Sequence, residues 1–178
     1  MLFPDAKPNA AHLALARLEA LGKVTAVITQ NIDGLHQAAG SKNVFELHGS
    51  VLRNYCEECG KFFDLNYIIS AGNTGQTVSS RDGIPLCDSC GGTIKPDVVL
   101  YEEGLNEKTL LGAIQHIKNA NVLIIGGTSL AVYPAAGLID YFSGDKLVVI
   151  NKTPTSRDNY ADLVIQEPIG SVFAKLSC

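Results

Sequence analysis

The 178-residue sequence predicts an α/β fold: a doubly wound parallel sheet into which a small four-cysteine module is inserted. Two observations predict it. Short apolar runs rich in Val and Ile alternate with segments of helical periodicity, which is typical of parallel strands joined by helices. Two Cys-x-x-Cys pairs interrupt this alternation. We therefore expect residues 1–53 and 92–178 to form the sheet domain and residues 54–91 to form the inserted module.

The expected elements follow the chain in order. A helix over 9–21 has Ala11 and Leu18 on one face, with Asn9 as N-cap and Gly22 at its end. Further helices are expected over 109–120, 132–143 and 169–176, and strands or extended segments over 24–29, 43–50, 97–103, 121–130, 146–151 and 161–166. A stretch rich in Gly, Ser and Thr around 72–83 is expected to form a flexible loop.

Composition excludes several classes of protein. Hydrophobic residues make up 46% and charged residues 18% of the chain, which is enough apolar material for a packed core. A net charge of −4 without a Lys/Arg cluster argues against direct nucleic-acid binding. The apolar runs are too short to cross a bilayer, and the first residues do not resemble a signal peptide. We therefore expect a cytoplasmic protein with no membrane partner.

The four cysteines of the module are Cys56, Cys59, Cys87 and Cys90, and each pair is followed by glycine. In a reducing compartment such pairs are metal ligands more often than disulfides. Four thiolates complete the tetrahedral sphere of a zinc ion and leave no position for water or substrate. We therefore predict one structural zinc (Zn²⁺) per chain. Two redox-active pairs, or coincidence, are the alternatives.

Polar residues follow several expected strands, at the sheet edge where α/β proteins bind ligands. Gln30, Asn31 and Asp33 offer amides and a carboxylate that can hold a carboxamide and a ribose; a turn of Asx caps is the alternative. His48 follows the short strand VFEL at 44–47, and its ordinary pKa suits a general base near neutral pH. A structural histidine is the alternative there, and His36 is the nearest competitor as base.

A second group of strand-end residues comes later in the chain. The string Gly-Gly-Thr-Ser over 126–129 follows an apolar strand, and its glycines allow a backbone to approach a phosphate or ribose. This string is not the G-x-G-x-x-G dinucleotide fingerprint and is a weak signal alone. Asn151 ends the next strand and can hydrogen-bond a ribose hydroxyl.

The ordered set of motifs resembles the sirtuin family, in its bacterial type, over nearly the whole chain. The matching strings are AKPNAAH at 6–12, TQNIDGLH at 29–36, ELHGS at 46–50, the two Cys-x-x-Cys pairs, KPDVVLYEE at 95–103, GTSL-x-V-x-P at 127–134 and IN at 150–151. The resemblance implies a Rossmann-like domain with a zinc-bearing small domain. It also implies an NAD-dependent protein lysine deacylase that consumes NAD as cosubstrate.

The resemblance assigns roles to individual residues. His48 is implied as the catalytic base. The implied NAD contacts are Gln30, Asn31, Ile32 and Asp33 around the nicotinamide and its ribose, and Gly127, Thr128, Ser129, Asn151, Lys152, Thr153 and Ile169 on the adenosine side. Val98 and Val99 are implied to bind acyl-lysine proteins or peptides by strand addition.

The implied reaction begins when the acyl oxygen of the modified lysine attacks the ribose carbon that carries nicotinamide. Nicotinamide leaves and an alkylimidate forms. His48 then takes a proton through the ribose hydroxyls, and water completes the release of lysine and O-acyl-ADP-ribose. A neutral imidazole is required, so activity is expected to fall as His48 becomes protonated.

The sequence departs from the sirtuin pattern twice. Tyr101-Glu102-Glu103 stands where the family commonly has Phe-Gly-Glu, which bears on the geometry of the peptide groove. The glycine-rich segment that sirtuins carry ahead of the first helix does not occur within the 178 residues, so we expect this chain by itself to bind NAD weakly. A truncated, non-catalytic zinc- and peptide-binding protein is therefore the alternative. A zinc-containing dehydrogenase is disfavoured, because the G-x-G-x-x-G fingerprint is missing and the zinc site is closed.

Overall fold

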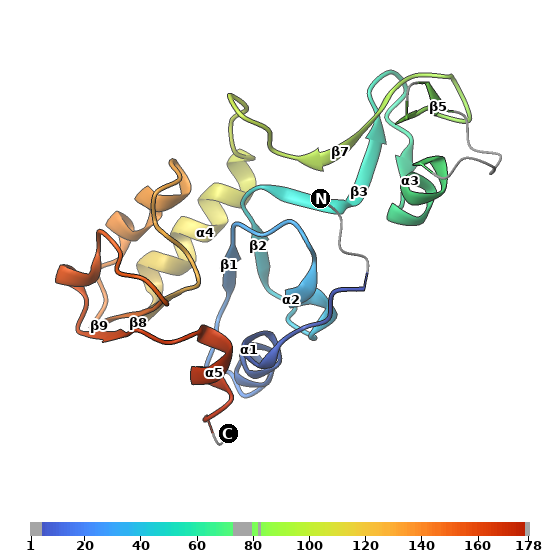
Figure 1. Ribbon diagram of the computed structural model, residues 1–178. Coiled ribbons are helices and arrows are strands. Elements are labelled where there is room, and N and C mark those ends of the chain that lie inside the picture. Colours follow the sequence, from blue (N-terminus) through green and yellow to red (C-terminus); the bar gives the residue numbers. More distant parts are fainter. Residues whose placement is uncertain (1–4, 73–79, 82, 177–178) are drawn as a thin grey trace. The chain divides into compact units, whose positions relative to one another are not determined.

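The computed structural model describes residues 5–72, 80–81 and 83–176, which fold into two compact units (Figure 1). Unit 1 draws on Met1–Gln30, Leu35–Leu47 and Leu105–Cys178, and unit 2 on Asn31–Gly34 and His48–Gly104. The loop expected around 72–83 lies largely outside the described residues. Among the described helices, none combines the length and the apolar character that a membrane crossing requires.

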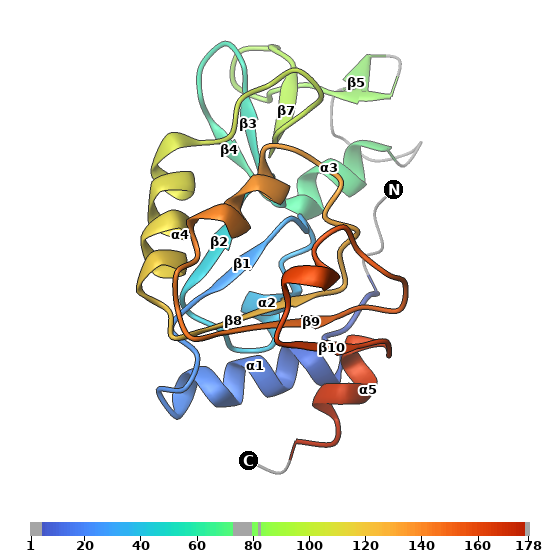
Figure 2. The same cartoon turned by 90° about the vertical axis from the view of Figure 1, so that its left-hand side faces the viewer.

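Unit 1 holds the parallel strands that the sequence predicts. Strand β1 (Val27–Thr29) pairs with β2 (Val44–Glu46), and a second sheet has the order β10 (Leu163–Ile165), β9 (Lys146–Ile150), β8 (Val122–Gly126). All of these pairs are parallel, and Figure 2 shows β8, β9 and β10 side by side. The α/β class is thus confirmed, with strands shorter than their apolar runs.

The first helix, α1 (Ala10–Ala20), forms where its caps predict it. The Asn9 side chain accepts hydrogen bonds from the backbone N–H groups of Ala11 (2.9 Å) and His12 (3.3 Å), which satisfies two donors that the first helical turn leaves open. The helix ends before Gly22, whose φ of +68° is the left-handed conformation that favours glycine.

The remaining helices of unit 1 are α2 (Leu35–Ala38), α4 (Glu107–Asn119) and α5 (Ile169–Phe173), with a short 3₁₀ helix η2 (Asp158–Tyr160) before β10. The helix expected over 132–143 is present over a shorter range as a 3₁₀ helix, η1 (Ala135–Tyr141). Pro134 donates no backbone N–H, and Gly137 is a poor α-helix former, which favours the tighter 3₁₀ form.

The core of unit 1 lies on both sides of its strands. On one side α1 and α5 run along β8–β10 (Figure 2), and Ala11, Ala14, Ile150 and Phe173 pack together there. On another side α4 and η1 bury a second cluster, which consists of Leu47, Ala113, Ile117, Ala135 and Leu138. Both clusters fix the strand ends that carry the candidate site residues.

Unit 2 is built on antiparallel pairing. The long strand β3 (Gly49–Cys56) pairs with β4 (Phe62–Phe63) and with β7 (Ile94–Val98), while β5 (Ser80–Arg81) pairs with β6 (Ile84–Pro85). The strand expected within 43–50, ending at His48, is present as β2 but ends at Glu46, and a turn at 47–48 separates it from β3. The extended segment expected over 97–103 begins earlier, as β7, and ends at Val98.

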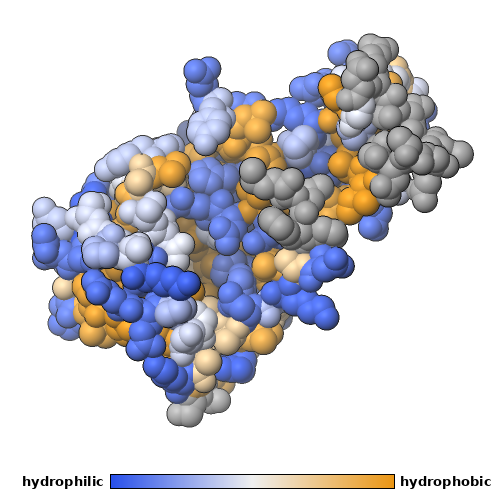
Figure 3. All heavy atoms as spheres, in the orientation of Figure 1, coloured by the Kyte–Doolittle hydropathy of each residue, from blue (hydrophilic) through white to orange (hydrophobic). Residues whose placement is uncertain are grey.

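Helix α3 (Leu65–Gly72) covers the cysteine end of unit 2, where the sequence predicted no helix. The buried side chains of Cys56, Phe63, Cys87 and Ile94 form the core there. Hydrophobic side chains also reach the surface around α3 and β3 (Figure 3). The core of this unit is thus small, and half of its buried cluster consists of candidate metal ligands.

Candidate active site and metal centre

Each cysteine pair forms a tight turn, called a knuckle here, and the two knuckles share one hydrogen-bond pattern. In the first knuckle (56–61), Gly60 N–H donates to the Cys56 carbonyl (2.9 Å) and Cys56 N–H donates to the Lys61 carbonyl (2.9 Å). In the second knuckle (87–92), the corresponding bonds from Gly91 to Cys87 and from Cys87 to Gly92 measure 2.9 and 2.8 Å. Gly60 and Gly91 have φ values of +70° and +74°, which explains why glycine follows each pair.

The two knuckles bring the four predicted ligands together. The four Sγ atoms lie within 4.8 Å of one another, with 3.4 Å between Cys56 and Cys90 and 3.7 Å between Cys59 and Cys87. A tetrahedral zinc ion with Zn–S bonds of about 2.3 Å needs sulfurs about 3.8 Å apart, so this arrangement fits zinc. The four cysteines are positioned to bind one zinc ion, as the sequence predicted.

Hydrogen bonding divides the thiols into more and less acidic ones. Burial opposes ionisation of Cys87, but backbone N–H groups of Ser89 and Cys90 and neighbouring thiols donate to its sulfur, so its pKa falls to about 7. At Cys90 a backbone N–H from Gly92 favours the thiolate, but hydrogen bonds with the Cys56 and Cys59 thiols outweigh it and raise the pKa to about 12. One thiolate is thus accessible near neutral pH, and a thiolate is the form that binds a metal.

One cation lies beside this centre. The Lys61 ammonium donates to the Asp88 carboxylate at 2.6 Å, which raises the pKa of Lys61 and lowers that of Asp88. Burial raises the pKa of the neighbouring Tyr67, whose hydroxyl donates to the Leu86 carbonyl (2.9 Å). Sequence analysis assigned no role to these residues, because the charges lie on different knuckles.

His48 lies in unit 2, in the turn that precedes β3, and is half-buried. Its carbonyl accepts a hydrogen bond from Val99 N–H (3.0 Å), and the next residue, Gly49, pairs with Val98. The candidate base is therefore tied through its backbone to the segment predicted to bind the peptide, Val98 and Val99.

The Asn31–Gly34 segment belongs to the same unit and is held against β3. The Ile32 carbonyl accepts Val51 N–H (3.0 Å) and the Ser50 hydroxyl (3.4 Å), and Ser50 Oγ also accepts Leu52 N–H (3.2 Å). Asn31 and Asp33 are exposed on either side of Ile32. Sequence analysis missed Ser50, a buried hydroxyl two residues after the candidate base, because the Ile32 carbonyl that it bonds is distant in the chain.

The candidate adenosine-side residues lie in unit 1, at the carboxyl ends of adjacent strands. Gly126 at the end of β8 pairs with Ile150 at the end of β9, so Gly127 and Asn151 leave the sheet at the same edge. Gly127 has a φ of +65°, and its N–H donates to the Ile150 carbonyl (3.1 Å). The Ile169 side chain fills the space where Gly126 would carry a Cβ. The structure thus brings these predicted residues together.

The rest of this edge is shaped by short-range hydrogen bonds. Thr128 Oγ1 accepts Leu130 N–H (3.2 Å), and the Asn151 amide donates to the Thr153 carbonyl (2.9 Å). Ser129, Lys152 and Thr153 are exposed there, and Gln30, also in unit 1, is half-buried after β1. The predicted NAD contacts are thus divided between the units, since Asn31, Ile32 and Asp33 belong to unit 2.

Comparison with known proteins gives one consistent result. A family model described as the Sir2 family matches residues 1–134. The NAD-dependent protein deacetylase of Clostridium acetobutylicum is 60% identical over 172 residues, covering 97% of this chain and 66% of that protein. The enzyme of the same name from Clostridium perfringens is 57% identical over 177 residues, covering 99% and 68%. The chain therefore spans about two thirds of the length of these relatives.

Solved structures agree with the sequence relatives. A structure described as "Sir2 bound to acetylated peptide" superposes with a TM-score of 0.88 at 41% identity, covering 98% of this chain and 72% of that one. A second, "Sir2-p53 peptide-NAD+", gives 0.86 at 42% identity, covering 96% and 69%. The similarity therefore extends over nearly all of this chain.

Proposed function

The chain belongs to the Sir2 family, the sirtuins, and from this premise we propose that it removes acetyl and related acyl groups from lysine side chains of proteins. NAD is the cosubstrate, and the products are nicotinamide, free lysine and O-acyl-ADP-ribose. One observation of geometry carries the proposal: the hydrogen bond of 3.0 Å between Val99 N–H and the His48 carbonyl. It joins the candidate base to the candidate peptide-binding edge within one compact unit.

His48 is the residue we propose as general base. NAD supplies the ribose carbon that takes up the acyl oxygen when nicotinamide leaves. Neutral imidazole at His48 accepts the proton of a ribose hydroxyl, which makes that oxygen a nucleophile toward the acyl carbon. The imidazole must be neutral to accept this proton.

Binding of NAD is divided among residues with different chemistry. Asn31 and Asp33 are proposed to hold the carboxamide and ribose by amide and carboxylate hydrogen bonds, and Gln30 and Ile32 are further proposed NAD contacts. On the adenosine side the backbone at Gly127 allows close approach of the cosubstrate. The other residues that we propose there are Thr128, Ser129, Asn151, Lys152, Thr153 and Ile169.

The peptide substrate is proposed to bind as an added strand. Val98 is the last residue of β7 and Val99 follows it, so backbone groups beyond the pairing with β3 are the proposed partners. Such main-chain recognition suits protein lysines in many sequence contexts. One similar structure is described as Sir2 bound to acetylated peptide, and the same class of partner is proposed here.

The zinc centre has a structural role in this proposal. Cys56, Cys59, Cys87 and Cys90 fill a tetrahedral coordination sphere, so no position is open for water or substrate. Zinc would stabilise the small core of unit 2 and take no part in the reaction. A reducing compartment keeps four thiolates available, which is why we place the protein in the cytoplasm.

The test is incubation of the protein with NAD and an acetylated lysine peptide, with nicotinamide and deacetylated peptide measured together. Substitution His48→Ala should lower the rate about 10²- to 10⁴-fold, the usual effect of losing a general base. His116→Ala is the control, because His116 lies on α4 in unit 1 against Phe45. Near-normal turnover by His48→Ala would disprove the assignment of the base, and reduction of NAD without nicotinamide release would indicate a dehydrogenase.

A further inference from the structure

Lys61 contacts both knuckles of the metal centre through different groups. Its backbone carbonyl closes the first knuckle by accepting Cys56 N–H (2.9 Å). Its ammonium group crosses to the second knuckle, where it donates to Asp88 (2.6 Å) and to the Ser89 hydroxyl (3.0 Å). Asp88 and Ser89 are the two residues between the ligands Cys87 and Cys90. One residue thus links the loops that supply the two halves of the thiolate set.

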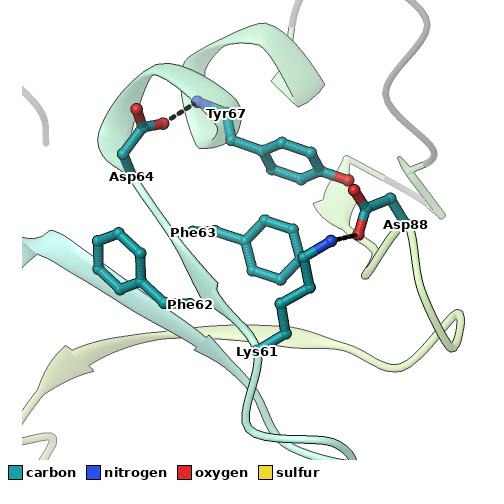
Figure 4. Close-up of a pocket in the computed structure, with 6 residues that line it drawn as sticks. All are labelled: Lys61, Phe62, Phe63, Asp64, Tyr67 and Asp88. Carbon is teal, nitrogen blue, oxygen red and sulfur yellow. Dashed lines mark hydrogen bonds and ion pairs between the residues drawn. The ribbon is translucent and has the colours of Figure 1, made fainter.

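The side chain of Lys61 is also held along its length. Its ammonium lies 5.3 Å from the centre of the Phe63 ring, a cation–π contact, and Phe63 is buried beside Tyr67 with ring centres 4.4 Å apart. Figure 4 shows the Lys61–Asp88 pair on the wall of a hollow of about 290 Å³. The Phe63 ring restricts the positions that the Lys61 ammonium can take, so the ion pair with Asp88 has a defined geometry.

The pair is partly open to solvent, since the side chains of Lys61 and Asp88 are 42% and 52% exposed. Exposed ion pairs add little to the stability of a whole protein. A link between the two knuckles should affect the release of zinc more than the stability of the whole protein. The reason is that a metal cannot leave a four-thiolate site until one pair of sulfurs moves away from the other. Residues around a metal's ligands commonly change metal affinity about 10- to 100-fold.

We propose that Lys61, Asp88 and Ser89 form a latch that holds the two knuckles together and slows the loss of zinc. Lys61 is a positioning residue here: its ammonium binds Asp88 and Ser89, between the ligands of the second pair, and so fixes the distance between the Cys56–Cys59 and Cys87–Cys90 pairs. The proposal concerns the zinc site alone and holds whether or not the protein is a deacylase.

The experiment measures how fast zinc passes from the loaded protein to the coloured chelator 4-(2-pyridylazo)resorcinol. The variants are Lys61→Met, which keeps the stem over Phe63 but removes the charge, Asp88→Asn, the double variant, and Lys61→Arg, which keeps an ion pair. The control is Lys146→Met, which breaks a comparable exposed pair with Asp162 (2.8 Å) in unit 1. Circular dichroism and zinc content before mixing establish that each protein starts folded and loaded.

The latch predicts that Lys61→Met and Asp88→Asn both accelerate zinc release about three- to tenfold, less than the range of about 10- to 100-fold for residues around metal ligands, because the pair is partly exposed to solvent. The double variant should be no faster than either single one, Lys61→Arg should release zinc at nearly the wild-type rate, and Lys146→Met should change nothing. High salt should bring the wild type closer to the variants by screening the pair.

Each other result would overturn the proposal. If Lys61→Met and Asp88→Asn changed the rate of zinc release in opposite directions, the net charge near the metal centre would control release, and the link between the knuckles would not. Additive changes, or unchanged release in both, would mean that the two residues act separately or not at all. If Lys61→Met fails to fold, Asp88→Asn and Lys61→Arg decide alone: equal release rates in these two variants would exclude a latch.

Discussion

Gly49, the residue after the candidate base, makes the closest approach between the two strands that form the β3–β7 junction. Its φ of +76° lies in the left-handed region, and a Cβ added there would overlap the Asp97 carbonyl oxygen and lie 3.3 Å from Val98 Cα. These obstacles are backbone atoms, which cannot rotate away as a side chain could. We therefore predict that Gly49→Ala separates β3 from β7 at this point.

Two contributions determine how much Gly49→Ala lowers the free energy of unfolding. A left-handed φ costs a non-glycine residue about 1–2 kcal/mol. Separating the strands weakens backbone hydrogen bonds such as that from Val99 N–H to the His48 carbonyl, each worth about 0.5–1.5 kcal/mol. Together these give a loss of about 2–4 kcal/mol in the free energy of unfolding. The weakened bond holds His48. The rate of the proposed deacylation should therefore fall by more, when expressed as a free energy, than the free energy of unfolding does.

The assay is denaturant unfolding of the zinc-loaded protein beside a control, Gly22→Ala. Gly22 has a similar φ of +68°, but nothing lies within 4 Å of its missing Cβ, so this control carries the backbone strain alone. The difference between the two variants isolates the effect of the strand approach. Equal losses in Gly49→Ala and Gly22→Ala would refute the reasoning, as would full activity of Gly49→Ala.

Three further predictions test other parts of the structure. Asn9→Ala should lower the free energy of unfolding by about 1 kcal/mol in a denaturant titration, whereas Asn9→Asp should keep the cap. Ser50→Ala, which removes a hydroxyl that is 1% exposed, should speed amide exchange at Leu52 without affecting α1; unchanged exchange would contradict its bridging role. The Lys146 hydrogen bond, with help from Leu147 N–H, lowers the pKa of Asp162 below its ordinary 3.8, so the stabilisation is complete above that pH and disappears as the pH falls through the lower folded value. Asp162→Asn should therefore be less stable than wild type at pH 6, and urea titrations at decreasing pH should show the difference closing.

The parts of the fold that sequence predicted best depend on short-range signals. The start and end of α1 follow from Asn9 and Gly22, whose effects operate within one helical turn. The metal centre follows from pairs that each close their own knuckle through hydrogen bonds between residues four and five apart. Neither prediction required knowledge of which distant segments meet.

The parts that sequence did not predict depend on distant segments. The pairing of β3 with β7 joins residues about forty positions apart, with a register shift between Ser50 and Asn54, and no local pattern encodes that partner. Helix α3 is a short, largely apolar segment, for which periodicity does not distinguish helix from strand. Lys61 and Asp88 are ordinary surface charges until the two knuckles meet.

The departure at Tyr101-Glu102-Glu103 illustrates how local chemistry can preserve a turn without its usual residue. Glu103 N–H donates to the Leu100 carbonyl (3.1 Å), and Glu102 occupies the third position of this turn with a φ of +72°, where glycine is favoured. The Glu103 carboxylate compensates by accepting Leu100 N–H (2.9 Å) and the Lys95 ammonium (3.2 Å), and these bonds lower its pKa.

These bonds hold the backbone in the form that a glycine would adopt freely, at a cost of about 1–3 kcal/mol for the strained residue. The Lys95 ammonium also donates to the Val98 carbonyl (3.3 Å), so the turn is fastened to the end of β7. The substitution therefore changes which side chains the turn presents, above all the fully exposed Tyr101. Any difference in peptide preference from other sirtuins should arise from that exposed ring.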